Sequence, residues 1–228
     1  MASFAYGAGD GAITDDGCAV ELYRRLRAGE EIDLIRGVAP AGGSILDLGA
    51  GTGRLANPLS AAGFAVTAID QSADMLAEIG GAVTCVQSTI EALELGARFD
   101  VVLLSSYLLN VPTAESRASL LRACMRHMKP GGVAAIQVRG QGILQDLSDF
   151  EREVDGIRDW VEAYRRDGLL VTITMRTEWE DRRWVQTFTQ RYLDETELRP
   201  ELAAVGLGFE RWLDPAPEWF VASVAADI

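Results

Sequence analysis

The segment that most constrains the fold is a glycine-rich loop directly after a short apolar run. Residues 44–48 read Ser-Ile-Leu-Asp-Leu, which predicts a short buried strand, and Gly49, Gly51 and Gly53 follow it. Glycine adopts backbone conformations that other residues avoid, and it lets a ligand approach the main chain closely. In open α/β sheets, ligands bind beside the carboxyl ends of the strands. The segment therefore predicts the first strand and the ligand-binding loop of an α/β domain.

The residues after this loop continue an alternation of helices and strands. Helices are expected from about residue 54, from residue 72 and around residues 120–128. Strands are expected at residues 64–69, 83–86, 100–104 and 133–138. Such alternation indicates crossover connections and a parallel sheet, and near-continuous apolar strands fit a sheet that is covered on both faces.

The pattern changes in the last third of the chain. The charged residues 146–166 are expected to be helical, and two runs rich in β-branched and aromatic residues, 169–177 and 183–192, predict an antiparallel hairpin. Two more strands are expected near residues 209–213 and 219–224. The predicted fold class is α/β, with a doubly wound, seven-stranded, mostly parallel Rossmann-like sheet and an inserted antiparallel lid.

The expected domain organisation is simple. Residues 1–17 are rich in Gly, Ala and Asp, which predicts a mobile N-terminal arm. Residues 18–228 are expected to form a single domain, in which residues 146–192 are the lid-like insertion.

Charge and cysteine content narrow the class of partner. The formal net charge is -13, so the chain repels nucleic-acid phosphates and anionic lipid, and neither is an expected partner. The three cysteines are far apart and form no C-x-x-C pair, which argues against a disulfide framework and a zinc site. Without a signal peptide or a membrane-length apolar run, a cytoplasmic location is expected. The oligomeric state is left open, with a homodimer as one option.

Two acids accompany the glycine loop. Asp47 precedes it, and Asp70 ends the second predicted strand, where an acid binds ribose hydroxyls. The spacing of Gly51, Gly53 and Ala56 also fits the G-x-G-x-x-A dinucleotide fingerprint, so an NAD(P)-dependent oxidoreductase is an alternative. Asp47 discriminates between the two, because a carboxylate beside the loop repels a pyrophosphate and suits a positively charged ligand. S-adenosylmethionine carries an ammonium and a sulfonium and no phosphate.

With these motifs the sequence resembles the class I S-adenosylmethionine-dependent methyltransferases over roughly residues 18–140. The C-terminal residues 188–193 and 206–207 are similar to those of bacterial small-molecule members. The segments that carry the main resemblance are Ile45–Arg54, Ala68–Ser72, Phe99–Val102 and Lys129–Gly132.

The resemblance implies a role for each matching position. Asp47 and the glycines would hold the methionine moiety and its amino group, and Asp70 would bind the ribose hydroxyls. Gln71 and Met75 would flank the adenine. The full set of implied cofactor positions is Asp47, Gly49, Ala50, Gly51, Gly53, Arg54, Asp70, Gln71, Met75, Thr89, Ile90, Glu91, Ser105 and Tyr23.

The chain departs from the family pattern after its third predicted strand. Many members carry an acid there that bonds the adenine amino group, whereas this chain has Thr89, Ile90 and Glu91. Thr89 or Glu91 would then replace the polar contact, and Ile90 would pack on the ring. Tyr23 and Arg54 would reach the carboxylate end of the cofactor.

Few residues are expected to take part in chemistry, because a sulfonium carries the reactivity and the protein supplies alignment and desolvation. Tyr107, just after the fourth strand, would orient an acceptor or act as a weak base, unless it only fills the core. Arg139, just after the fifth strand, would bind a substrate carboxylate or oxyanion, unless it is a plain surface arginine. The single histidine, His127, lies late on a helix and is expected to be structural. No metal site is expected.

The predicted function is methyl transfer to a small molecule, a natural product or another secondary metabolite, with an aromatic compound as one candidate. S-adenosylhomocysteine is the expected second product. Whether oxygen, nitrogen or carbon is methylated stays open, although the lack of an obvious strong base favours an amine or an electron-rich ring carbon. A non-catalytic module that binds S-adenosylmethionine is the second alternative.

Overall fold

A computed structural model of the protein describes residues 4–140, 147 and 149–225. The larger part of the protein is built around a seven-stranded sheet. Its strand order is β11-β12-β6-β5-β2-β3-β4. Neighbours from β6 to β4 are parallel, whereas β12 is antiparallel to both β6 and β11. This arrangement confirms the expected fold class. The strands are β2 (Ser44–Leu48), β3 (Ala65–Asp70), β4 (Thr84–Gln87), β5 (Phe99–Leu104), β6 (Met128–Gln137), β11 (Leu207–Trp212) and β12 (Trp219–Val224).

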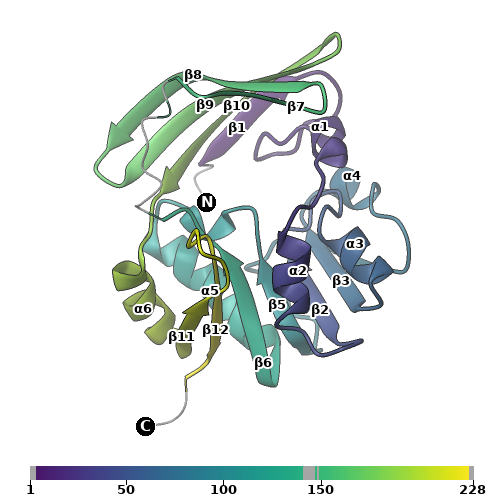
Figure 1. Ribbon diagram of the computed structural model, residues 1–228, viewed down its shortest axis with the longest axis vertical. Coiled ribbons are helices and arrows are strands. Elements are labelled where there is room, and N and C mark those ends of the chain that lie inside the picture. Colours follow the sequence, from purple (N-terminus) through teal and green to yellow (C-terminus); the bar gives the residue numbers. More distant parts are fainter. Residues whose placement is uncertain (1–3, 141–146, 148, 226–228) are drawn as a thin grey trace.

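Helices cover both faces of this sheet (Figure 1). Because side chains alternate along a strand, Leu46 and Leu48 join a core with α5 and α6, whereas Ile45 joins a second core with α2 and α3. In the described part of the chain, no helix combines the length and apolar character needed to span a membrane. The helices are α1 (Val20–Arg25), α2 (Glu31–Arg36), α3 (Ala56–Ala61), α4 (Ala73–Leu76), the short 3₁₀ helix η1 (Leu108–Asn110), α5 (Ala114–His127) and α6 (Glu195–Ala203).

A second sheet of five antiparallel strands lies across one end of the α/β layer (Figure 1). Its order is β1-β10-β9-β8-β7, and its buried side chains include Val171, Ile173 and Tyr192. It is joined to the carboxyl end of β5, because Asn110 Nδ2 donates to the Arg191 carbonyl at 2.7 Å. The strands are β1 (Ala5–Gly9), β7 (Glu151–Val154), β8 (Ile157–Asp167), β9 (Leu170–Trp179) and β10 (Arg182–Arg191).

Strands β7 and β8 correct the expectation of a helix over residues 146–166; residues 146 and 148 lie outside the described range. An Asp-Gly pair at residues 155–156 connects β7 to β8, and another at 167–168 connects β8 to β9. Asp155, Gly156 and Gly168 have φ values of 52°, 76° and 60°. Positive φ at such positions is what tight hairpin turns require. The many charged residues of this segment gave no indication of strands, because most of their side chains lie at exposed strand positions.

Strand β1 differs from the expectation of a free N-terminal arm, since it pairs with β10 along its whole length. Its small residues permit close backbone contacts: a Cβ at Gly7 would lie 2.2 Å from the Gly17 carbonyl oxygen. The segment after β1 is fixed as well, because Trp184 Nε1 donates to the Asp10 carbonyl at 2.7 Å. Residues 1–3 lie outside the described range. The expected division of the chain at residues 17, 146 and 192 stays a prediction.

Candidate functional site

Asp47 is a buried carboxylate near the end of β2. Its exposed fraction is 1%, and its Oδ1 has no hydrogen-bond partner among the described residues. Burial raises the pKa of Asp47 to about 7, which the charge of Arg54 opposes and the charge of Asp70 reinforces. A buried carboxylate oxygen without a partner is costly. Asp47 is therefore suited to bind a ligand that supplies a hydrogen-bond donor or a positive charge.

The loop after Asp47 needs glycine for two reasons. Gly49, Gly51 and Gly53 have φ values of 70°, 55° and 83°, which side chains disfavour. A Cβ at Gly49 would also lie 2.6 Å from Leu108 Cδ1. The loop is closed by the Gly53 N–H, which donates to the Ala50 carbonyl at 3.0 Å. The expected loop residues are thus held together at the carboxyl end of β2.

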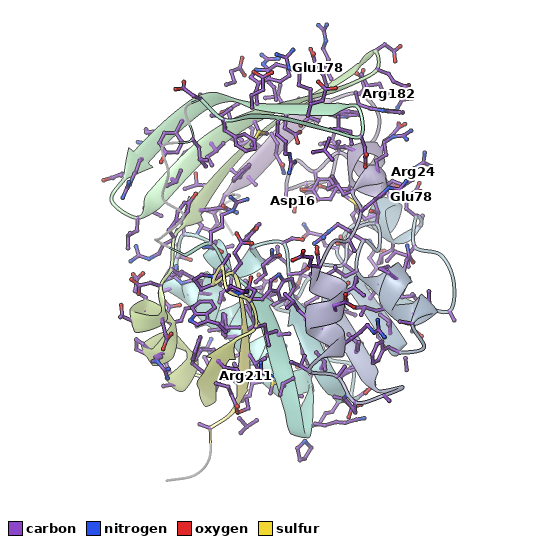
Figure 2. The ribbon with its side chains drawn as sticks, in the orientation of Figure 1. Asp16, Arg24, Glu78, Glu178, Arg182 and Arg211 are labelled. Atoms are coloured by element: carbon purple, nitrogen blue, oxygen red, sulfur yellow. The ribbon has the colours of Figure 1, made fainter. Side chains whose placement is uncertain are left out.

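Asp70 lies directly across this loop, at the end of β3. Its Oδ2 accepts from the Gly51 N–H at 2.8 Å, and its Oδ1 accepts from the Ser72 N–H at 2.9 Å. Burial raises the pKa of Asp70, these two hydrogen bonds lower it, and the charge of Asp16 raises it. Figure 2 shows Asp16 between the second sheet and the α/β layer. The two expected acids, Asp47 and Asp70, therefore flank one glycine loop.

Tyr23 and Arg54 lie beside the same loop. Tyr23 Cδ1 is 3.9 Å from the point that a Cβ on Gly51 would occupy. Burial raises the pKa of Tyr23 well above its usual value. Arg54 forms an ion pair with Glu31, which ties the loop to α2. The structure brings both residues to the loop, with Arg54 already engaged by a carboxylate.

The residues expected around the adenine follow β3 and β4. Met75 is buried, with its N–H bonded to Ser72 Oγ at 3.2 Å, and Gln71 is exposed, with its carbonyl accepting from Gln87 Nε2 at 3.0 Å. Of these two residues, Met75 is thus the one that supplies apolar surface.

The three residues after β4 are not equivalent. Ile90 Cδ1 lies 3.7 Å from the position of a Cβ on Gly49, so it reaches the glycine loop. Thr89 is exposed, and its Oγ1 accepts from the Ala92 N–H at 3.3 Å. Glu91 is half-buried. The structure brings Ile90 to the loop and engages Thr89 in a local turn.

Tyr107 follows β5 in an unusual backbone conformation. Ser106 and Tyr107 have φ values of 55° and 59°, and the preceding Ser105 is buried. Consecutive left-handed residues other than glycine are strained and cluster at functional sites. The Tyr107 hydroxyl donates to Glu218 Oε2 at 3.0 Å, and burial raises the pKa of Tyr107 to about 12. Tyr107 is therefore protonated near pH 7, and its hydroxyl is already engaged by Glu218; its expected role toward an acceptor stays a prediction.

Arg139 follows β6 and lies over the same tyrosine. Its Cζ is 4.1 Å from the centroid of the Tyr107 ring, a distance typical of a cation–π contact. Its Nε is buried without a hydrogen-bond partner. Among the described residues, no carboxylate oxygen lies within 4.0 Å of the guanidinium nitrogens. Arg139 is thus a half-buried cation rather than a plain surface arginine.

Sequence reasoning assigned no role to two residues that complete this site, Asn110 and Glu218. Asn110 is fully buried and bonds both the N–H and the carbonyl of Arg139. Asn110 stands shortly after β5, between Leu109 and Val111, and a polar residue in such an apolar stretch could have indicated a role in the site. Glu218 comes from the far end of the sequence, and only the fold brings it to Tyr107.

His127 is a structural residue at the end of α5. It is 2% exposed, its Nδ1 lies 2.8 Å from the Ala123 carbonyl, and its Nε2 accepts from the Leu95 N–H at 3.4 Å. Burial lowers the pKa of His127. Within residues 4–140, 147 and 149–225, no group of three or more His, Cys, Asp or Glu side chains is placed to hold a metal ion.

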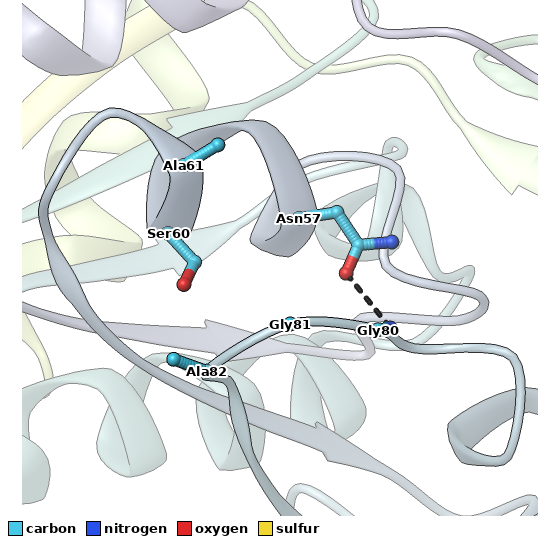
Figure 3. Close-up of a pocket in the computed structure, with 6 residues that line it drawn as sticks. All are labelled: Asn57, Ser60, Ala61, Gly80, Gly81 and Ala82. Carbon is cyan, nitrogen blue, oxygen red and sulfur yellow. Dashed lines mark hydrogen bonds between the residues drawn. The ribbon is translucent and has the colours of Figure 1, made fainter.

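A cleft of ≈ 870 Å³ lies between the glycine loop and the second sheet. It is lined by Thr52 and Gly53 on one side and by Trp179 on the other, and Arg25 Cζ stacks 3.3 Å from the Trp179 ring centroid. A smaller hollow of ≈ 450 Å³ lies between α3 and residues 80–82 (Figure 3), where Asn57 Oδ1 accepts from the Gly80 N–H at 3.1 Å. The hollow contains none of the expected site residues.

The sequence matches a known family over part of its length. A family model described as "Methyltransferase domain" matches residues 45–132. The ubiquinone biosynthesis O-methyltransferase of Azotobacter vinelandii is 43% identical over 101 residues, which cover 40% of this chain and 42% of the relative. The cypemycin N-terminal methyltransferase of a Streptomyces species is 32% identical over 143 residues, which cover 60% of this chain and 56% of the relative. The chain thus spans about half the length of the curated relatives it matches.

Solved structures share the fold over nearly the whole chain. The CcbJ methyltransferase from Streptomyces caelestis has a TM-score of 0.76 at 20% identity, covering 91% of this chain and 96% of that one. The sugar N-methyltransferase KedS8 from Streptoalloteichus has a TM-score of 0.72 at 21% identity, covering 94% and 97%. The expected resemblance to methyltransferases is confirmed by the family model over residues 45–132, and the solved structures confirm the expected fold.

Proposed function

We propose that this chain, whose residues 45–132 match a methyltransferase-domain family model, transfers a methyl group from S-adenosylmethionine to a small-molecule amine. The observation that carries the proposal is the buried, unpartnered Asp47 carboxylate beside the glycine loop. It fits the ammonium of that cofactor and would repel the pyrophosphate of a dinucleotide.

The residues present fit the cofactor in character. Asp47 and the N–H groups of the glycine loop would hold the methionine moiety, and Asp70 the ribose hydroxyls. Met75 and Ile90 supply apolar surface for the adenine. When bound, S-adenosylmethionine supplies an electrophilic methyl group, which a nucleophile takes as the thioether leaves. The residues of the chain bind and align the two partners and exclude water.

An amine is the acceptor that the polar groups support best. Tyr107 keeps its proton because its pKa is raised to about 12, and the buried His127 is bonded inside its own helix. An amine needs no strong base, since it attacks once it has released one proton to a weak acceptor such as a carboxylate. Three similar proteins are a sugar N-methyltransferase, an amino pentose methyltransferase of calicheamicin biosynthesis and a peptide N-terminal methyltransferase, whereas the ubiquinone biosynthesis relative is an O-methyltransferase. They also support a natural product as the acceptor.

The cofactor is tested by calorimetric titration of the purified chain with S-adenosylhomocysteine and, separately, with oxidised and reduced nicotinamide dinucleotides. We expect tight binding of the thioether and none of the dinucleotides. Asp47→Asn and Asp70→Ala should each weaken binding at least about tenfold, the loss expected when a charged hydrogen-bonding group is removed. Asp33→Asn, at an exposed surface pair with Arg36, is the matched control. Binding of a dinucleotide alone would replace the proposal by an oxidoreductase.

Activity is tested by the release of S-adenosylhomocysteine with matched amine and alcohol acceptors. We expect turnover with amines. Tight binding of S-adenosylhomocysteine without turnover across the acceptors would instead favour a non-catalytic binding module.

A further inference from the structure

Opposite charges flank Tyr107. The guanidinium of Arg139 lies over the face of the ring, 4.1 Å from its centroid. The carboxylate of Glu218 lies at the hydroxyl end of the Tyr107 side chain, with its Oε2 3.0 Å from the hydroxyl oxygen. Arg139 follows β6 and Glu218 precedes β12, two neighbouring strands of the main sheet. One tyrosine therefore separates a cation from an anion.

Neither charge has a counter-ion among the residues that the structure describes. No oppositely charged nitrogen or oxygen lies within 4.0 Å of either side chain, although the same part of the chain holds many ion pairs elsewhere. Arg117 illustrates how a buried arginine is usually neutralised, because it donates two hydrogen bonds to the Glu201 carboxylate, at 2.7 and 2.6 Å. A half-buried charge without a counter-ion costs free energy that a bound counter-ion recovers.

The main chain of each charged residue is held by hydrogen bonds. The main chain of Arg139 is bonded to Asn110 on both its N–H and its carbonyl. The Glu218 carbonyl accepts from the Val138 N–H at 2.7 Å, and the Glu218 N–H donates to Asp214 Oδ1 at 3.2 Å. Groups fixed before the ligand arrives lose little entropy on binding, which is how recognition sites are built.

We propose that the acceptor is a zwitterion, an amino acid or a molecule with an amino acid's pair of charges, whose carboxylate binds Arg139 and whose amine faces Glu218. The inference rests on the proposed function and adds the substrate class. Glu218 Oε2 accepts from Tyr107, which leaves Oε1 for the amine. The proton that the amine releases before it is methylated passes to this carboxylate and on to water.

The test uses three probes with one scaffold: L-phenylalanine, with both charges; phenethylamine, with the amine alone; and hydrocinnamate, with the carboxylate alone. Each is titrated into the full chain through the millimolar range, with and without saturating S-adenosylhomocysteine. Binding is followed by the ¹⁵N–¹H signal of the Arg139 Nε–H group, which is assigned by its absence in Arg139→Gln. We expect this signal to shift with L-phenylalanine, to shift less with hydrocinnamate, and not to shift with phenethylamine.

Two variants, each of which removes one charge, separate the two contributions. Arg139→Gln should weaken binding of L-phenylalanine about tenfold and remove its advantage over phenethylamine, as measured by calorimetry. Glu218→Gln keeps an acceptor for the Tyr107 hydroxyl and should remove the advantage of L-phenylalanine over hydrocinnamate. The controls Arg183→Gln and Glu153→Gln change the same charges on exposed strand positions and should leave both preferences intact.

The two proposals fail in different ways. An Arg139 signal that ignores L-phenylalanine, or that responds equally to phenethylamine, overturns the zwitterion while S-adenosylhomocysteine binding stands. A shift with L-phenylalanine in a chain that does not bind S-adenosylhomocysteine would keep the zwitterion site and overturn the methyltransferase.

Discussion

The side chain of Asn110 holds the backbone of Arg139 on both sides. Its Oδ1 accepts from the Arg139 N–H at 2.9 Å, and its Nδ2 donates to the Arg139 carbonyl at 3.1 Å. Nδ2 also donates to the Arg191 carbonyl at the end of β10. One buried amide therefore fixes Arg139 and joins the two sheets at the point where the acceptor is proposed to bind.

Replacing this amide should destabilise the protein. Asn110→Ala removes three hydrogen bonds and leaves buried backbone groups of Arg139 and Arg191 without partners. We expect a loss of about 2–4 kcal/mol in the free energy of unfolding, measured by urea unfolding followed by circular dichroism and fluorescence. Asn57→Ala, which removes a single bond to the Gly80 N–H, should cost about 1 kcal/mol or less. Equal losses in the two variants would contradict the anchoring role.

Asp47 should make the ligand-free protein less stable as the pH rises. Its folded pKa, about 7, lies above the value of about 3.9 in an unfolded chain. The stability that the protonated group provides is therefore fully present below about pH 4 and is lost as the pH rises to about 7. Asp47→Asn should be more stable than the parent at pH 8 by about 1–3 kcal/mol, and this gain should shrink toward pH 4.

Urea unfolding across this pH range checks the expectation. Asp33→Asn, at a side chain that is 84% exposed, should show no such gain at any pH. A gain for Asp47→Asn that does not change with pH would mean that the carboxylate is already satisfied in the ligand-free protein. The same variant should bind S-adenosylhomocysteine poorly, because the group that costs stability is the one that holds the ligand.

The main sheet could be predicted from the sequence, and most of the second sheet could not. The segments that form β2 and β5 are short apolar runs. Because helices connect the strands of this part of the chain, the sequence predicts a parallel sheet. β8 is instead a charged strand whose pairing depends on β9, so tertiary contacts override its local preference. The Asp-Gly pairs at residues 155–156 and 167–168 were a local signal of its turns. Strand β1 was hidden because glycine and alanine carry no strand preference.

The candidate site divides in the same way. Asp47, Asp70 and the glycines lie within one local strand–loop–helix–strand pattern, so sequence spacing was enough to place them together. Tyr107 and Arg139 could be placed at strand ends, but their contact could not be predicted. Glu218 joins them through the antiparallel pairing of β12 with β6, which no local pattern encodes.

His127 should contribute stability that depends on pH in the opposite sense to Asp47. Its folded pKa is lowered by burial, so only the unfolded chain takes up a proton just below pH 6.5. The contribution of the neutral ring is therefore present above about pH 6.5 and is lost as the pH falls below it. His127→Gln should cost about 1–2 kcal/mol at pH 8 and less at pH 5.

Urea unfolding at the two pH values provides this comparison. Binding of S-adenosylhomocysteine should be unchanged in His127→Gln, because the ring bonds only within α5 and to Leu95. A large loss of binding would place His127 in the site after all.

Gly49 should be the loop position where an added methyl group does most damage. Alanine there takes a strained φ of 70° and places its Cβ 2.6 Å from Leu108 Cδ1. Gly63 has a φ of 94° with no heavy atom within 4 Å of an added Cβ, so Gly63→Ala isolates the backbone strain. We expect Gly63→Ala to cost about 1 kcal/mol and Gly49→Ala about 1–2 kcal/mol more.

Calorimetry separates the two variants further. Because Gly49 is in the loop that follows Asp47 and its added Cβ would meet Leu108 and Ile90, only Gly49→Ala should weaken binding of S-adenosylhomocysteine, by at least about tenfold. Equal stability losses in the two variants would show that Leu108 moves aside without cost. Unchanged affinity in Gly49→Ala would place the cofactor away from this loop, and the Asp47 argument for a cationic ligand would then lose its geometric basis.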